Sequence, residues 1–236
     1  MFDGSNVTFH KVKIVVVGDS GVGKTSLTHL ICEQQPITNP AWTLGCSVEV
    51  KLHEFKEGTP FQKTYFIELW DVGGRQSHQN TRHVFYNPTH GIILVHDLSN
   101  RKSEQNLQKW LQEVLSKDGN NGKNRQFDDF DPERFVGSTQ IPILVVGTKL
   151  DLIESKSYLH RRSSTIAEEC GADEIFLDCL HVRSLAAGTT SSVKLSRFFD
   201  KVIERRYYGN KDIASPEKRR LHAYTPPYSQ KIYHND

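Results

Sequence analysis

The sequence contains no apolar run long enough to cross a membrane. A membrane-spanning helix needs about 18 or more consecutive apolar residues, and no segment of these 236 residues approaches that length. The first residues, MFDGSNVTFHKVK, also lack the apolar core of a secretory signal peptide. These absences argue against the membrane-spanning and secreted classes. They predict a cytoplasmic protein that reaches membranes only transiently, through partners.

Cysteines are few and widely separated. Cys32, Cys46, Cys170 and Cys179 have neither metal-type nor disulfide-type spacing, which favours buried, reduced thiols. The last cysteine is Cys179 and the sequence ends in YHND, so the pattern lacks a prenylation motif. We therefore expect no stable membrane anchor.

Charge of neither sign is in large excess. The sequence has 30 Lys and Arg residues and 28 Asp and Glu residues, and no dense basic patch is interleaved with aromatics. This balance does not favour a nucleic-acid-binding protein. The basic stretch 201–220 is interrupted by acids and has no apolar period beyond Tyr208, which is typical of a solvated segment rather than a membrane-binding one.

The sequence does contain strand patterns that alternate with helix patterns. Two segments alternate with period two around KEGTP and predict an antiparallel hairpin. Helical periodicity occurs at 103–115, with Ser103 as the expected N-cap, and at 191–208. The strand patterns cover 11–18, 47–55, 63–71, 91–97, 141–149 and 173–179. We expect an α/β fold of three layers, with a mostly parallel six-stranded sheet, one antiparallel edge strand and helices on both faces.

Two regions fall outside this alternation and suggest how the chain is divided. Residues 117–140 are polar and rich in turn formers, which predicts a long surface insertion. Residues 209–236 contain several prolines and no apolar period, which predicts a flexible tail. We therefore expect one domain over 11–208, preceded by a short extension at 1–10.

The motif GDSGVGKT follows the first strand pattern directly and precedes a helical one. It matches G-x-x-x-x-G-K-T, in which backbone N–H groups at a helix N-terminus cradle a polyphosphate. Lys24 is expected to contact the outer phosphates, and Thr25 to offer its hydroxyl to Mg²⁺. A chance glycine-rich turn is the alternative, but the strand–loop–helix context favours a P-loop NTPase. The expected nucleotide-binding residues are Gly18, Asp19, Ser20, Gly21, Val22, Gly23, Lys24 and Thr25.

A second motif, GTKLD, ends another buried strand pattern and predicts the base specificity. The Asp151 carboxylate can accept from the ring N–H and the exocyclic amine of guanine, whereas adenine offers no such donor pair. Lys149 would lay its aliphatic stem over the base plane, and Thr148 lies beside both. An ordinary surface pair of Lys149 and Asp151 is the alternative.

Together these motifs resemble the Ras superfamily of small GTPases. GDSGVGKT, TLG, WDVGG and TKLD occur in the family's order over about residues 11–206, and GCSVEV and YFIELWDVGG are similar to the atypical Rab-like protein 3 subfamily of the Rab branch. The resemblance implies a G-domain that binds GTP or GDP with Mg²⁺. It assigns Thr43 and Asp71 to the Mg²⁺ site with Thr25, and Gly74 to γ-phosphate sensing. Regulatory or effector proteins would contact the switch regions, and a homodimer is a further expected assembly.

The sequence departs from this family at the position of the water-orienting glutamine, which is Arg75. Arginine has five donors and no acceptor, so it cannot accept a proton from water. Gln76, the next residue, could substitute only if the backbone shifted. Arg75 and Gln76 are therefore weak catalytic candidates, and we expect slow intrinsic hydrolysis. A solvated Arg75 in a surface loop is the alternative.

Two further departures concern the guanine base. Pro36 stands where the family usually has an aromatic residue that stacks on guanine, and Trp42 is expected to face a partner or the core instead. The last base-supporting loop reads LDCLHV rather than Ser-Ala-Lys, and Asp178 and Cys179 are its loosely assigned candidates. Phe85 and Tyr86 resemble effector-contacting aromatics of the family, with core packing as the alternative.

The functional expectation is a GTP/GDP-binding regulatory switch with slow hydrolysis, acting in trafficking or signalling through protein partners. A constitutively GTP-loaded scaffold or dimerising module is the second hypothesis, and an ATP-using P-loop kinase is the third. A metal site built from His78, His83, His90 and His96 is not favoured, because these residues are expected in a loop, a helix and a strand.

Overall fold

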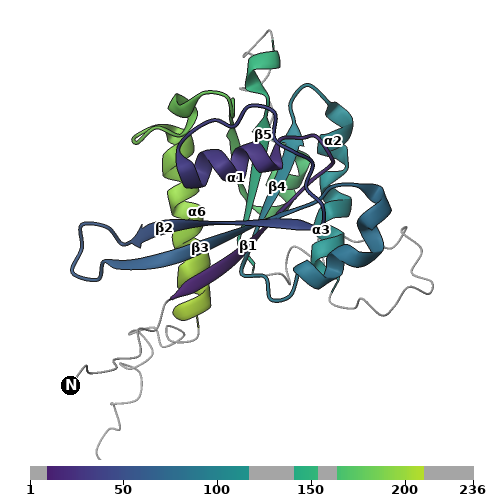
Figure 1. Ribbon diagram of the computed structural model, residues 1–236. Coiled ribbons are helices and arrows are strands. Elements are labelled where there is room, and N and C mark those ends of the chain that lie inside the picture. Colours follow the sequence, from purple (N-terminus) through teal and green to yellow (C-terminus); the bar gives the residue numbers. More distant parts are fainter. Residues whose placement is uncertain (1–9, 117–140, 154–163, 210–236) are drawn as a thin grey trace, which may run out of the picture.

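The computed structural model describes residues 10–116, 141–153 and 164–209 as a three-layer α/β fold (Figure 1). A central sheet separates two groups of helices. The expected N-terminal extension up to residue 9, the surface insertion 117–140 and the tail from residue 210 lie outside the described residues.

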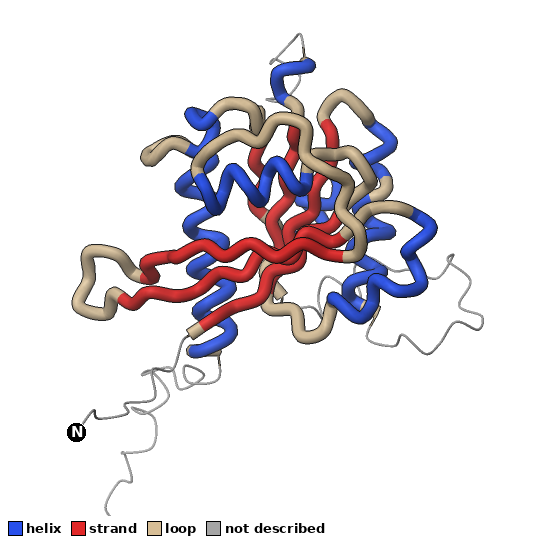
Figure 2. Tube along the Cα trace, viewed as in Figure 1, coloured by secondary structure: helices blue, strands red, loops and turns tan. Residues whose placement is uncertain are grey.

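The sheet has six strands in the order β2-β3-β1-β4-β5-β6. Only β2 and β3 pair antiparallel, and β2 lies at the edge. The other neighbouring strands pair parallel. Figure 2 shows the strands at the centre of the fold with helices around them. The expected mostly parallel sheet with one antiparallel edge strand is thereby confirmed. The strands are β1 (Lys11–Val17), β2 (Cys46–Phe55), β3 (Lys63–Val72), β4 (Gly91–Asp97), β5 (Ile143–Thr148) and β6 (Asp173–Phe176).

The central strands are apolar along almost their whole length because helices cover both faces. In β1 every residue after Lys11 is buried, and β4 is buried throughout. Strand β2 differs from the central strands. Its alternate residues Val48, Val50 and Leu52 point to the same face of the sheet and are exposed. The sequence pattern therefore reports the position of each strand in the sheet.

Helices α1 and α6 pack on one face of the sheet, while α3 and α5 pack on the other. Leu27 and Leu30 of α1 share an apolar cluster with Phe198 of α6. Leu111 of α3 and Ile166 of α5 belong to the second cluster. The helices are α1 (Lys24–Glu33), α2 (Arg101–Gln105), α3 (Leu107–Leu115), α5 (Thr165–Cys170) and α6 (Thr190–Tyr207), with short 3₁₀ segments η1 (Gln76–Phe85), η3 (Leu150–Leu152) and η5 (Val182–Leu185).

The expected helix over 103–115 is divided into α2 and α3, and the N-cap assigned to Ser103 is wrong. Asn100 is the N-cap, because its side chain accepts a hydrogen bond from Lys102 N at 3.2 Å. Ser103 is fully buried inside α2. Its hydroxyl donates to Asn100 O at 2.6 Å and accepts from Asp97 N at 3.0 Å. A polar side chain just before an apolar period looks like a cap in the sequence, but here it ties α2 to the end of β4.

The four cysteines are free thiols, as expected, but of these four only Cys179 is buried, while Cys32, Cys46 and Cys170 are half-buried. Burial raises the pKa of Cys179 to about 12 and that of Cys46 to about 11, so both thiols are protonated at neutral pH. Within the described ranges, no helix has the length and apolar character needed to cross a membrane.

The packing of α6 against the sheet predicts a large loss of stability for Phe198→Ala. The Phe198 side chain is 1% exposed, and its truncation leaves a cavity in the core. We expect the free energy of unfolding to fall by about 3–5 kcal/mol, measured by urea denaturation at a fixed GDP concentration. Val193→Ala on the same helix is the matched control, because Val193 is 46% exposed. Equal effects of the two substitutions would contradict this packing.

Candidate nucleotide-binding site

The sequence motifs meet at the carboxyl ends of the parallel strands. GDSGVGKT connects β1 to α1, WDVGG ends β3 and continues into the loop before η1, and TKLD ends β5. These three strands lie close together in the sheet (Figure 1). Open α/β sheets bind their ligands at this edge.

The P-loop presents backbone N–H groups at the start of α1. Gly23 is the N-cap residue of α1, has a φ of 91°, and provides no side-chain capping bond. The first N–H groups of the helix therefore have no intrahelical acceptor. A φ in this range disfavours residues with a Cβ. The loop is suited to an anion at a helix N-terminus.

Lys24 is held inside this loop by main-chain oxygens. Its side chain is buried, and its Nζ donates to Gly18 O and Asp19 O, both at 2.9 Å. Burial lowers the pKa of Lys24 to about 8, although the nearby Asp71 and Asp19 carboxylates partly oppose this. The cation is positioned without a carboxylate in direct contact, so it can contact a phosphate.

Thr25, Thr43 and Asp71 converge from α1, the α1–β2 loop and the end of β3. The hydroxyls of Thr25 and Thr43 donate to Asp71 Oδ2 at 2.6 and 2.9 Å, and the two hydroxyl oxygens lie 3.1 Å apart. The other carboxylate oxygen, Asp71 Oδ1, is buried and has no hydrogen-bond partner among the described residues. Hydroxyl and carboxylate oxygens are suitable ligands for Mg²⁺, which typically binds one or two carboxylates together with phosphates and water. The residues present therefore fit this cation.

Gly74 brings the loop after β3 directly against the P-loop. A Cβ at this position would lie 2.6 Å from Asp19 C, Gly18 O and Ser20 N. Any side chain would have to displace the P-loop backbone. This close approach joins the expected γ-phosphate-sensing residue to the phosphate-binding loop.

The residues expected around the guanine base gather at the ends of β5 and β6. Thr148 Oγ1 lies 2.5 Å from Val22 O, which connects TKLD to the P-loop. Asp151 is exposed in η3, and Asp178 accepts from Leu180 N at 2.8 Å. Burial is the main cause of the raised pKa of Cys179, and the nearby carboxylates of Asp178 and Asp151 raise it further. The three residues therefore lie in one neighbourhood.

The Lys149 ammonium binds Asp97, a contact that the sequence did not indicate. Lys149 Nζ lies 2.6 Å from Asp97 Oδ2. Burial alone would raise the pKa of Asp97, but hydrogen bonds from Lys149 and Ser99 outweigh it and hold this pKa below its ordinary value. Asp97 ends β4, next to β5, so it fixes the Lys149 stem at the edge of the base site. The position of Asp97 at the end of a predicted strand was the sequence feature that could have indicated a role at the site.

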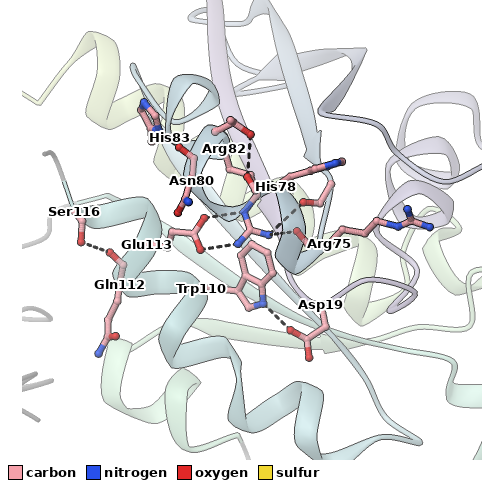
Figure 3. A network of polar contacts seen from close by, with 12 residues as sticks. Asp19, Arg75, His78, Asn80, Arg82, His83, Trp110, Gln112, Glu113 and Ser116 are labelled. Carbon is pink, nitrogen blue, oxygen red and sulfur yellow. Dashed lines mark hydrogen bonds and ion pairs between the residues drawn. The ribbon is translucent and has the colours of Figure 1, made fainter. Parts of the chain in front are cut away.

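A polar network connects the P-loop to α3 (Figure 3). The Asp19 carboxylate accepts from Trp110 Nε1 at 2.8 Å and from Asn106 Nδ2 at 2.7 Å. The Arg82 guanidinium carbon lies 4.1 Å from the centroid of the Trp110 ring. The indole therefore connects the phosphate-binding loop to the segment that follows WDVGG.

Arg82 is the buried centre of this network. Its Nε and Nη2 donate to the two oxygens of Glu113 at 2.8 Å each. Its Nη1 donates to Gly73 O at 3.4 Å and Arg75 O at 3.3 Å. Tyr86 also donates to Glu113, at 2.7 Å. This bidentate pair attaches the backbone after β3 to α3, and none of its members was a predicted site residue.

Arg75 and Gln76 do not enter the cluster around Lys24. Both are exposed at the beginning of η1. The Arg75 guanidinium carbon lies 3.7 Å from the centroid of the Trp42 ring. Trp42 is 70% exposed, so the alternative in which Trp42 packs in the core is wrong. Pro36 is exposed and in the same loop.

The remaining aromatic and histidine candidates have different surroundings. Tyr86 is buried and Phe85 is half-buried against the second core cluster, so core packing explains the first of them better than partner contact. The four histidines do not form a metal site, since the described part of the chain contains no group of three or more His, Cys, Asp or Glu side chains suited to a metal ion. Burial lowers the pKa of His96 to about 4, so this core histidine is neutral.

These features define the class of small GTPases, and comparisons with known proteins agree. Residues 13–124 match the family model described as Ras of Complex, Roc, domain of DAPkinase. Over 221 residues the chain is 53% identical to Rab-like protein 3 of Bos taurus, covering 89% of this chain and 93% of the relative. It is 52% identical over 225 residues to Rab-like protein 3 of Homo sapiens, covering 91% and 95%.

The similarity extends to a plant protein over a smaller region. The chain is 39% identical over 152 residues to the small GTPase LIP1 of Arabidopsis thaliana, covering 60% of this chain and 42% of the relative. Given the coverage by the animal relatives, the chain belongs to the Rab-like protein 3 family of small GTPases. Membership of this family implies binding of GTP and GDP.

The Arg82–Glu113 pair predicts a stability defect for Arg82→Met. The substitution removes both guanidinium donors from the Glu113 carboxylate, which keeps only the Tyr86 hydroxyl among the donors described above, and it removes the Arg82 donor from Gly73 O and Arg75 O. We expect the free energy of unfolding to fall by about 3–5 kcal/mol, measured by urea denaturation with GDP present. Arg82→Met with Glu113→Gln should cost less than the sum of the single changes. Lys11→Met removes an exposed ion pair with Glu68 and should change stability little. Additive effects at Arg82 and Glu113 would argue against the pair.

Proposed function

We propose that this chain is a GTP/GDP-dependent switch that hydrolyses GTP slowly. The observation that carries the proposal is the contact of Thr25, Thr43 and Asp71 at the end of β3, with one Asp71 oxygen left buried and unpaired. Such a contact brings the loop before β2 onto the P-loop. A switch needs a mobile segment whose position depends on the ligand.

The P-loop residues hold the phosphates in this proposal. The N–H groups at the start of α1 and the Lys24 ammonium face the phosphate chain, while Gly74 contributes its N–H. Thr25, Thr43 and Asp71 hold the cation. Mg²⁺, when bound, neutralises phosphate charge and orders the phosphate oxygens. Asp151 accepts from guanine, and Asp97 keeps the Lys149 stem in place.

Slow hydrolysis follows from the chemistry of Arg75. The family's glutamine accepts a hydrogen bond from the attacking water and donates another, whereas a guanidinium can only donate. In this structure the Arg75 guanidinium is also engaged with Trp42. Gln76 is exposed at the first position of η1, and no hydrogen bond within the described ranges orients its side chain toward Lys24. Neither Arg75 nor Gln76 therefore provides a positioned acceptor for the water.

In this proposal, protein partners bind the two loops that meet at this site. The switch acts in the cytoplasm, in trafficking or signalling. Trp42 and Leu44 on the loop before β2, and Val84 in η1, are exposed apolar side chains, and such side chains are suited to a protein partner.

A GTP-loaded scaffold, which includes a homodimer, is the second candidate function. The Arg75–Trp42 contact favours this candidate, because a guanidinium bound to Trp42 does not take part in GTP hydrolysis. Purified protein that carries mostly GTP supports the scaffold, while mostly GDP supports the cycling switch. Adenine nucleotides would contradict guanine recognition.

Asp151→Asn should change the base preference of the protein. The amide replaces an acceptor with a donor, which weakens guanine binding and favours the extra carbonyl of xanthine. We expect the affinity for GTP to fall by roughly 10- to 100-fold, as for a lost hydrogen bond to a charged group, and the affinity for XTP to rise. Asp173→Asn is the control, because Asp173 begins β6 and its carboxylate pairs with Lys201 of α6. Retained GTP affinity in Asp151→Asn would contradict the assigned contact.

Arg75→Gln should accelerate hydrolysis. Single-turnover GTP hydrolysis is compared in wild type, Arg75→Gln and Arg75→Ala at saturating Mg²⁺. Glutamine restores an acceptor near the water, so we expect an increase of about tenfold or more. Alanine removes the cation without adding an acceptor, and should not accelerate the reaction. An unchanged rate in Arg75→Gln, or an equal increase in Arg75→Ala, would refute this explanation of Arg75.

A further inference from the structure

The Arg75 side chain connects the two loops that border the nucleotide site. Its guanidinium carbon lies 3.7 Å from the centroid of the Trp42 ring, which places the cation over the face of the indole. Trp42 belongs to the loop between α1 and β2, and Arg75 to the loop between β3 and η1. In Figure 3 the Arg75 side chain points away from the Arg82–Glu113 pair. The contact is therefore separate from the buried network.

The backbone of Arg75 is fixed, so its side chain projects from a defined point. Its carbonyl accepts from Arg82 Nη1 at 3.3 Å and from His78 N at 3.1 Å. Arg82 is itself held by Glu113 on α3. No ion pair of Arg75 occurs among residues 10–116, 141–153 and 164–209. The aromatic face is thus the principal contact of this cation.

The other side of the contact leads directly to the candidate cation site. Trp42 immediately precedes Thr43, whose hydroxyl donates to Asp71 at 2.9 Å. The two loops also meet through their main chains, since Gly73 N donates to Gly45 O at 2.8 Å. Arg75 and Trp42 are both exposed, so their contact lies at the surface. Holding Trp42 in place therefore holds Thr43 at the site.

We propose that Arg75 is a positioning residue whose stack on Trp42 latches the loop before β2 onto the loop after β3, keeping Thr43 against Asp71 and slowing the release of GTP. The proposal rests on the proposed function, because it deepens the role of the same site. The position that the family uses to orient water is used here to hold the nucleotide. Removal of either partner opens the same latch.

Dissociation of a fluorescent, hydrolysis-resistant GTP analogue tests the latch. Its rate is measured at saturating Mg²⁺ in wild type, Trp42→Ala, Arg75→Ala and the double variant. We expect each single change to accelerate dissociation roughly two- to five-fold, the rate equivalent of a cation–π contact at an exposed site. The double variant should be no faster than the singles, because one contact is lost in all three. Arg75→Lys and Trp42→Phe should restore part of the wild-type rate.

Leu44→Ala is the matched control. Leu44 lies in the same loop and is 75% exposed, so its truncation removes an apolar side chain without touching Arg75. Its dissociation rate should equal that of wild type. Both partners of the latch are exposed, so the variants should retain the wild-type melting temperature. Multiplicative effects in the double variant, or unchanged rates in the singles, would overturn the latch.

Hydrogen exchange over residues 41–45 separates this proposal from the proposed function. Trp42→Ala and Arg75→Ala should both accelerate exchange of these amides, whichever nucleotide is present. A chain that retains no guanine nucleotide overturns the proposed function, while accelerated exchange in both variants would still support the contact between the loops. Unchanged exchange in the variants overturns the latch even when GTP binds.

Discussion

The carboxylate of Asp71 joins three parts of the site at one buried point. It lies at the end of β3, is 1% exposed, and accepts through a single oxygen from hydroxyls on α1 and on the loop before β2. A buried carboxylate is costly unless its lone pairs are satisfied. Two hydroxyl donors on Oδ2 satisfy half of this demand, and Oδ1 has no hydrogen-bond partner. The carboxylate that brings the loops together therefore also presents an oxygen that a cation could bind.

A second buried charge, that of Arg82, holds the segment after β3 and supports the P-loop. Arg82 forms a bidentate pair with Glu113 on α3 and contacts two carbonyls of the segment that follows β3. Trp110 contacts both Arg82 and Asp19, so α3 supports the phosphate-binding loop as well. A buried pair of this kind fixes geometry more reliably than it adds net stability. The phosphate loop and the segment after WDVGG thus share one support, and a displacement of either affects the other.

The parts that could be predicted from the sequence are those encoded locally. The central strands are continuous apolar runs because both of their faces are covered, and GDSGVGKT depends on its direct position between a strand and a helix. The missed features are pairs formed across the fold. Arg82 and Glu113 are 31 positions apart, and Asp19 and Trp110 are 91 apart. Neither periodicity nor spacing specifies such partners. Ser103 shows the opposite error, since a local rule suggested a cap while a tertiary contact with β4 determined its role.

Arg75 shows how one change of side chain has two physical consequences. A glutamine at this point has both a donor and an acceptor, which is what a water-orienting residue needs. A guanidinium loses the acceptor, but it gains a planar cation that stacks on aromatic faces. Because Arg82 fixes the Arg75 backbone, that cation is delivered to Trp42, next to Thr43. The group that would favour removal of the γ-phosphate is replaced by one that favours the closed arrangement around it. The proposed slow hydrolysis and the proposed retention of GTP therefore share one physical cause, the donor-only, planar chemistry of Arg75.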